Sequence, residues 1–157
     1  MRALGDVLAV ANPIAFGRVS RIQELALAVA KRMNLPEQWP LEFASLASQL
    51  GHIALPEKTL RRLYSGESLT PVESTQLSKS AKVAERILAR IPRLGPVVEI
   101  LTYLAGDSRP ETRTPDSVAA EILRAVSEYE VFERTSSSRN AAVQRLGTMR
   151  AGWIPRC

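Results

Sequence analysis

The sequence predicts an all-α fold, a bundle of about seven to eight amphipathic helices. Apolar residues recur every three or four positions over most of the 157 residues, which is the spacing of one helix face. Alternation of apolar and polar residues, the pattern of a half-buried strand, is nearly absent. Proline and glycine separate the periodic segments, so most of the predicted helices have a recognisable end.

Proline and glycine locate the ends of the first three predicted helices. A first helix over about 2–11 stops before Pro13, since the residue that precedes proline is disfavoured in the helical region. A third helix, over about 37–50, ends at Gly51, which adopts the left-handed conformation without a steric penalty. Between them a second helix, over about 16–33, carries one apolar stripe formed by Ile22, Leu25, Val29 and Met33.

The clearest start signal opens the fifth helix. A short helix containing TLRRLYS ends at Gly66, and the run TPVE at 70–73 then has a hydroxyl at the N-cap, proline at the first helical position and glutamate at the third. Thr70 and Glu73 can satisfy two free backbone N–H groups reciprocally, as a capping box. The helix is predicted to continue to about Ile91, with that side chain inward, and to stop at Pro92.

Three further helices follow, over about 94–105, 115–134 and 139–150. The charged, proline-containing segment 106–116 is predicted to be a loop. On the helix over 115–134, the side chains expected to face inward are Val118, Ile122, Ala125, Tyr129 and Phe132. No internal repeat period is evident, so a bundle is favoured over a solenoid.

Length and composition favour one domain without a membrane partner. A chain of 157 residues buries about two-thirds of its unfolded surface, and its 45% hydrophobic and 24% charged residues are ordinary for a globular protein. No segment approaches the roughly 20 uninterrupted apolar residues of a membrane helix. Cys157 is the only cysteine, so an intrachain disulfide is impossible and a cytoplasmic location is expected.

The formal net charge of +5 is a weak indication of an anionic partner. The 21 lysines and arginines are interleaved with 16 carboxylates, and aromatic residues, at 5%, offer few platforms for base stacking. We interpret the basic residues as solvated helix faces. A DNA- or RNA-binding helical module stays open as an alternative, because LAVAKRMNLPEQ is similar to a helix-turn-helix opening, and its binding would fall steeply with salt.

Several stretches, taken in order, resemble the HD-GYP branch of the HD-domain phosphohydrolases. They are GRVSRIQELALAVAKRMNLP, SLASQLGHIALPEKTLRRLYSGESLTPVE, SAKVAERILARIPRL, VVEILTYLAG and AEILRAVSEYEVFE. Together they span about residues 16–146 of the chain. The resemblance implies an HD-domain-like helical bundle and, in catalytic members, a phosphodiesterase whose clustered histidine and carboxylate ligands hold iron, manganese or a similar metal.

The resemblance also implies where the metal-site residues of the family would fall. The first histidine falls on Arg18, the His-Asp pair falls on Ser48 and Gln49, and the lysine after the glycine falls on His52. The histidine of the long helix falls on Ser80, the paired histidines fall on Leu104 and Ala105, and the last aspartate falls on Ser127. The Gly-Tyr-Pro loop is replaced by RPETRTP. Such a metal site needs at least three protein ligands, so neither a metal, a cofactor nor phosphodiesterase activity is expected.

Other chemistry has little support in the sequence. A Ser-His-acid triad would have to use His52, the only histidine, and no nucleophile-elbow sequence lies near it. Cys157 lacks the charged surroundings that activate a thiol. An enzyme of the metal-dependent kind would need a site of carboxylates alone, built from residues such as Glu24, Glu42, Glu85 and Glu128.

A scaffold that has lost its ligands favours recognition over catalysis. The resemblance implies a non-catalytic signalling domain, the output domain of a bacterial two-component response regulator, formed by residues 16–150. Residues 1–15 would be a linker helix and junction, joined to a receiver domain if the chain is part of a longer regulator, and 151–157 a C-terminal tail. The expected partner is a protein, and a homodimer stays open.

The former metal cleft and the tail supply the candidate contact residues. Arg18 either holds a small anionic ligand or pairs with a nearby carboxylate. Trp153 and Ile154 are candidate partner contacts, because buried aromatic anchors supply much of the energy of an interface. The side chains expected to line the cleft as hydrogen-bonding groups are Arg18, Ser48, Gln49, His52, Ser80 and Ser127.

Overall fold

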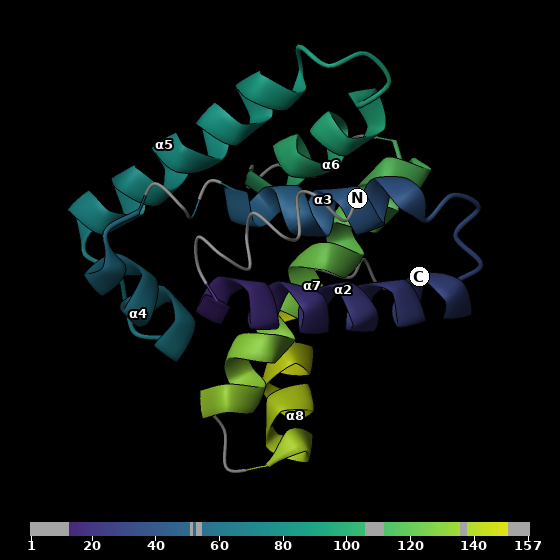
Figure 1. Ribbon diagram of the computed structural model, residues 1–157. Helices are drawn as coiled ribbons and strands as arrows, with labels where there is room; N and C mark the ends of the chain where they lie inside the picture. Colours follow the sequence, from purple (N-terminus) through teal and green to yellow (C-terminus); the bar gives the residue numbers. More distant parts are fainter. Residues whose placement is uncertain (1–12, 51, 53–54, 106–111, 136–137, 151–157) are drawn as a thin grey trace.

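The structure confirms the all-α prediction (Figure 1). The computed structural model describes residues 13–50, 52, 55–105, 112–135 and 138–150, which form seven helices and no strand. The helices are α2 (Pro13–Arg32), α3 (Trp39–Leu50), α4 (Glu57–Ser65), α5 (Pro71–Leu88), α6 (Gly95–Ala105), α7 (Pro115–Thr135) and α8 (Arg139–Arg150). The predicted helix over 2–11, loop residues 106–111, Gly51, Trp153 and Ile154 lie outside the described residues. In the described part of the chain, no helix combines the length and the apolar character that crossing a bilayer requires.

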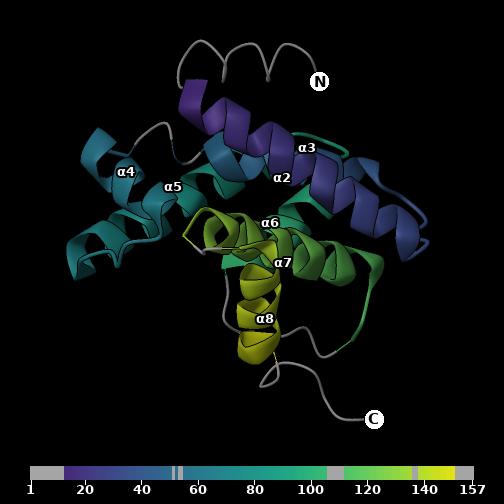
Figure 2. The same ribbon diagram turned by 90° about the horizontal axis from the view of Figure 1, so that it is seen from below.

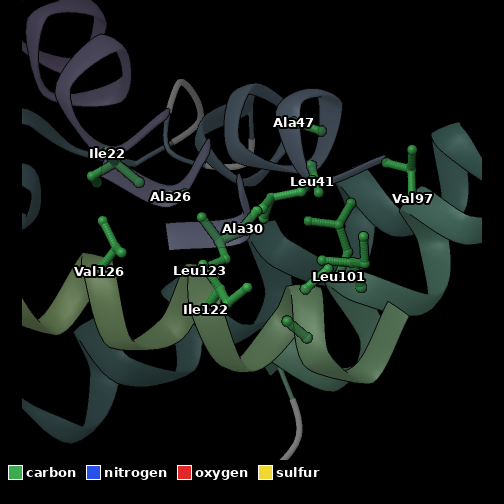
Figure 3. Close-up of a cluster of buried hydrophobic side chains, with 14 of the residues drawn as sticks. Ile22, Ala26, Ala30, Leu41, Ala47, Val97, Leu101, Ile122, Leu123 and Val126 are labelled. Atoms are coloured by element: carbon green, nitrogen blue, oxygen red, sulfur yellow. The ribbon is translucent and has the colours of Figure 1, made fainter. Parts of the chain in front are cut away.

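Four helices enclose the main core. α2, α3 and α7 pack against one another, and α6 packs against α3 and α7. Figure 3 shows the apolar side chains of these helices meeting between the ribbons. The largest of the fully buried side chains in this core are Ile22, Leu41, Ile100 and Leu123. Removing their surface from water stabilises the fold by about 1.5–3 kcal/mol for each of these side chains.

The remaining helices lie around this core (Figure 2). α5 packs on α6 and α3, α8 packs on α7, and α4 contacts α7. A second, smaller cluster of buried side chains, Leu55, Leu60 and Tyr64, packs with Leu63 and Leu77. Because α4 lies apart from the main core, its position depends on this small cluster and on the contacts of Tyr64.

Ile22 is buried as predicted, and Leu25 packs against the core, but beyond them the buried stripe of α2 lies one position away from the predicted one. Ala26 and Ala30 are 0% exposed, whereas Val29 and Met33 are 38% and 49% exposed. α2 packs against both α3 and α7, and the distance between packed helices depends on the side chains at the contact, so alanine permits a close approach. The prediction followed side-chain size and was therefore wrong for Val29 and Met33.

α5 is shorter than predicted. It ends at Leu88, and Ile91, which was expected to face inward, is 47% exposed. Pro92 disfavours the helical conformation of the residue before it, and the chain then passes through Arg93 at a φ of 72° before α6 begins. Leu88, 4% exposed, is thus the last core residue of the helix.

The predicted capping box is observed, and the end of α2 shows a well-defined stop. The Thr70 hydroxyl accepts from the Glu73 N–H, and the Glu73 carboxylate accepts from the Thr70 N–H over 2.8 Å, which completes the capping box of α5. At the end of α2, Asn34 adopts a φ of 53°, and the Leu35 N–H donates to the Ala30 carbonyl over 3.0 Å. This left-handed residue with a 6→1 bond is a Schellman-type stop.

Replacing Thr70 by alanine removes the capping bond of α5 and is expected to lower the free energy of unfolding by about 1 kcal/mol. Urea unfolding followed by circular dichroism measures the change. Ser78→Ala is the matched control, because the Ser78 hydroxyl bonds a carbonyl of its own helix and its loss is expected to change stability by less than about 0.5 kcal/mol. Equal losses in the two variants would contradict the role assigned to the cap.

Candidate functional site: a buried polar cluster

A buried ion pair joins α2 to α7. Arg18 Nε lies 2.8 Å from Glu130 Oε2, and the two side chains are 7% and 4% exposed. Of the two alternatives for Arg18, pairing with a carboxylate is therefore the one observed. Arg134, one turn further along α7, places its Nη1 3.5 Å from Glu130 Oε1. Two cations thus share one carboxylate, which leaves the group with a net positive charge.

Arg18 also contacts α4. Its guanidinium carbon lies 4.7 Å from the centroid of the Tyr64 ring, which is the geometry of a cation–π contact. Tyr64 is 4% exposed, so its ring covers the guanidinium on this side. Arg18 therefore connects three helices: α2, α4 and α7.

A chain of hydrogen bonds links the end of α3 to the same tyrosine. Ser48 donates to the Ser45 carbonyl over 2.8 Å, and Gln49 Nε2 donates to Ser48 Oγ over 3.2 Å. Gln49 Oε1 is thereby directed at His52 Nδ1, 2.8 Å away, and the Tyr64 hydroxyl lies 3.4 Å from the same nitrogen. Because Gln49 Oε1 can only accept, this network assigns the imidazole proton to Nδ1.

We call Arg18, Gln49, His52, Tyr64 and Glu130 the polar cluster. Burial, followed by the Arg18 charge, lowers the pKa of His52 to about 4, so the imidazole is neutral at pH 7. Burial raises the pKa of Tyr64. Burial also lowers the pKa of Arg18, an effect that the Glu130 carboxylate opposes. The arginine nonetheless keeps its charge, since its ordinary pKa lies far above neutral pH.

One group of the polar cluster has no acceptor among the described residues. Arg18 Nη1 is buried without a hydrogen-bond partner, and the contact of Arg18 Nε with Glu130 Oε2 lacks the alignment of a hydrogen bond. A buried donor without an acceptor costs about 1–3 kcal/mol. The guanidinium is therefore held by charge and by an aromatic face rather than by a full set of directed bonds.

The structure brings together four of the six predicted cleft residues. Arg18, Gln49 and His52 belong to the polar cluster, and Ser48 bonds to Gln49 at its margin. Ser127 is half-buried on α7, one turn before Glu130. Ser80 lies in α5, but its side chain is outside the described residues.

Sequence reasoning missed Tyr64 and Glu130. Glu130 is 3% exposed and continues the buried stripe of α7, at the helical spacing of Leu123 and Val126. A carboxylate on that stripe could have indicated a buried charged group. Tyr129 and Phe132 were instead predicted to face inward, and both are only half-buried. Tyr64 gave no signal of its own, because a tyrosine on an amphipathic helix has the same pattern whether its ring covers an aliphatic side chain or a guanidinium.

The polar cluster does not fit a divalent metal. Over residues 13–50, 52, 55–105, 112–135 and 138–150, no three His, Cys, Asp or Glu side chains lie close enough together to hold one. The resemblance assigns the family's first histidine to the position of Arg18, whose guanidinium is a fixed charge that repels a metal cation. Within the described residues, no group of three His, Cys, Asp or Glu side chains includes Glu24, Glu42, Glu85 or Glu128, the residues that the carboxylate-only alternative would need.

Comparison with protein families identifies the helical scaffold. The sequence model described as HD domain matches residues 2–153. The chain belongs to the HD-domain family. No curated protein and no solved structure matches it. HD domains are typically metal-dependent phosphohydrolases, so this HD domain combines the frame of the family with a cluster that lacks the usual donor set.

A second arginine occupies another ligand region of this HD domain. The family's paired histidines fall on Leu104 and Ala105, at the end of α6. There, Arg124 Nη2 of α7 donates to the Tyr103 carbonyl and, over 3.2 Å, to the Leu104 carbonyl. A cation at the C-terminus of a helix satisfies free carbonyls and complements the helix dipole. This arginine fixes α6 to α7 at that point.

Arg18→Met leaves Glu130 buried with one of its two cations removed and is expected to lower the free energy of unfolding by about 3 kcal/mol. The double variant Arg18→Met/Glu130→Leu removes both charges and is expected to lose less than Arg18→Met alone. Urea denaturation measures both. In the control Arg21→Met, the lost pair with Glu133 is half-exposed, and its expected loss is below about 1 kcal/mol. A double variant that loses as much stability as Arg18→Met, or more, would contradict the pairing.

His52 is the single histidine, so imidazole NMR signals follow its titration without overlap. The folded protein is expected to titrate near its lowered pKa of about 4 and to show the Nδ1–H neutral ring at pH 7. Because the folded pKa lies below the ordinary 6.5, the unfolded chain binds the proton first, and stability is expected to fall as pH decreases from 6.5 towards 4. Arg18→Met is expected to raise this pKa. A folded-state pKa near 6.5 would refute the buried, Arg18-facing position of the ring.

Proposed function

We propose that this HD domain is a non-catalytic signalling module, the output domain of a two-component response regulator, and that it acts by contact with other proteins. The polar cluster carries the proposal. At the positions of the family's first metal ligands, the chain has an ion pair, a cation–π contact and hydrogen bonds. Hydrolysis of the family's kind needs a metal that lowers the pKa of a bound water, and these side chains do not form a metal site.

The same contacts support a mechanical role for the former active site. Arg18 joins α2 to α4 and α7, and the hydrogen-bonded chain from Ser48 to His52 holds the end of α3 against Tyr64. A displacement of α2 would disturb the contacts of Arg18 with both neighbouring helices at once. Buried polar networks of this kind have few satisfied arrangements, so they suit a domain that passes on a change in position.

The proposal assigns the remaining parts of the chain accordingly. Residues 1–15 connect residues 16–150 to a receiver domain in the cytoplasm, and α2, which begins at Pro13, receives the change through them. The tail 151–157 contributes Trp153 and Ile154 to the contact with a protein partner or with a second copy of the chain. The proposal assigns no cofactor to the domain.

Metal analysis of the purified chain, together with a cyclic-dinucleotide hydrolysis assay with added Mn²⁺ or Fe²⁺, tests the proposal. The expected result is substoichiometric metal and no turnover above that of buffer, because three converging ligands are needed and no such group occurs among the described residues. Stoichiometric metal in the natural chain, or turnover that follows its concentration, would overturn the proposal.

A variant that restores donors serves as the matched control. Arg18→His, Ser48→His, Gln49→Asp and Ser127→Asp together return imidazoles and carboxylates to positions where the family's ligands fall. This variant is expected to retain more metal than the natural chain after dialysis, and circular dichroism establishes that it is folded. If the variant retains metal and the natural chain does not, the helical frame can hold a metal and the natural side chains are the reason that it does not. If neither retains metal, the frame itself is unsuited to a metal.

A further inference from the structure

α5 presents a row of basic side chains on its exposed face. Lys79, Lys82, Arg86 and Arg90 follow one another at intervals of three or four residues, and each is exposed. At that spacing they lie on one side of the helix and of the turn that extends it. α5 runs along the outer edge of the molecule, with α6 and α3 on its inner side (Figures 1 and 2). We call these four residues the basic row.

The members of the basic row form no ion pair among the described residues, and they differ from other unpaired cations in that all four lie on one side of a single helix and the turn that follows it. Arg21, Arg61, Arg62 and Arg134 each form an ion pair with a glutamate. None of the ion pairs within the described residues includes a member of the row. The acidic residues of α5 point elsewhere: Glu85 accepts from Thr102 of α6, and Glu73 belongs to the capping box and pairs with Arg62. The row is therefore an uncompensated line of positive charge.

We propose that the basic row binds the phosphate backbone of a nucleic acid, an activity beyond the proposed contact with proteins. Adjacent cations of the row are about 5–6 Å apart along the helix axis, and the whole row is about 16 Å long. Phosphates of one duplex strand recur about every 3.4 Å along the axis while the strand winds around it, so a straight row of this length can contact several neighbouring phosphates. α5 contains no aromatic residue for base stacking. The binding is therefore independent of sequence and dominated by charge.

Two other anionic partners fit the face less well. An anionic membrane would need apolar side chains to insert, and the large exposed ones beside the end of the row are only Ile87 and Ile91 within the described residues. An acidic protein would have to present several carboxylates in line at the same spacing. A nucleic acid supplies that repeated charge in every sequence, which is why the observations favour it.

Fluorescence anisotropy of a labelled 20-base-pair DNA duplex and of the corresponding RNA duplex, with the full chain at 50 mM KCl, tests the proposal. The expected result is binding that weakens as salt rises, with a slope of log K against log salt of about −4 for the DNA. In the variant Lys79→Gln/Lys82→Gln/Arg86→Gln/Arg90→Gln the affinity is expected to fall more than about tenfold, and Lys79→Gln alone is expected to reduce the slope by about one.

The control changes the net charge equally at other exposed cations that have no ion pair among the described residues: Lys31→Gln, Arg32→Gln, Lys58→Gln and Arg113→Gln. Retention of most of the affinity by this control supports the row as the binding surface. An equal loss in the two variants, or no binding of the natural chain at 50 mM KCl, overturns the proposal. Binding to poly-glutamate, or to vesicles of phosphatidylcholine and phosphatidylserine, that is as tight as binding to the duplexes also overturns it. Thermal melting of both variants checks that they are folded.

Discussion

The arrangement of this HD domain depends on one buried interaction, the ion pair of Arg18 with Glu130. Both side chains are more than nine-tenths buried, and an isolated charge at such a depth is strongly unfavourable. Each side chain is therefore tolerated only while α2 and α7 stay close enough for the charges to meet. Since the Tyr64 ring covers the same guanidinium, the position of α4 is tied to that pair as well. His52 feels the charge too, and its imidazole stays neutral.

A guanidinium and a bound metal ion place positive charge at a site in different ways. A metal must be captured by several converging ligands and offers open coordination positions to water or substrate. The guanidinium of Arg18 is covalently attached and always charged, and it cannot lower the pKa of a bound water as a metal does. Arg18 cross-links α2, α4 and α7 through its charge and its contact with the Tyr64 ring. Under the signalling role proposed above, the output comes from surfaces, and the described chain offers one candidate in the row of unpaired positive charge on α5.

Local chemistry explains which parts of this structure the sequence could predict. The capping box at Thr70 and the stop at Gly66 depend on side chains and backbone within a few residues of one another, so they were recognisable from the sequence alone. The buried stripes of α2 and α7 depend on which neighbours pack against them: Ile22 and Ile122 were predicted correctly, but further along each helix the prediction was one position away. Glu130 pairs with a residue 112 positions earlier in the chain, and no local pattern encodes that distance. The resemblance predicted that Arg18 lines the cleft, whereas its contacts with Glu130 and Tyr64 are known only from the fold.

Hydrogen–deuterium exchange measured by mass spectrometry tests most directly whether Arg18 holds α4 in place. The measurement compares the natural chain with Arg18→Met/Glu130→Leu, in which no buried charge is left without a partner. The account predicts faster exchange in peptides from α4 (Glu57–Ser65), with little change in peptides from α6 (Gly95–Ala105), which packs in the main core. Unchanged exchange in α4, or an equal acceleration in both helices, would contradict it.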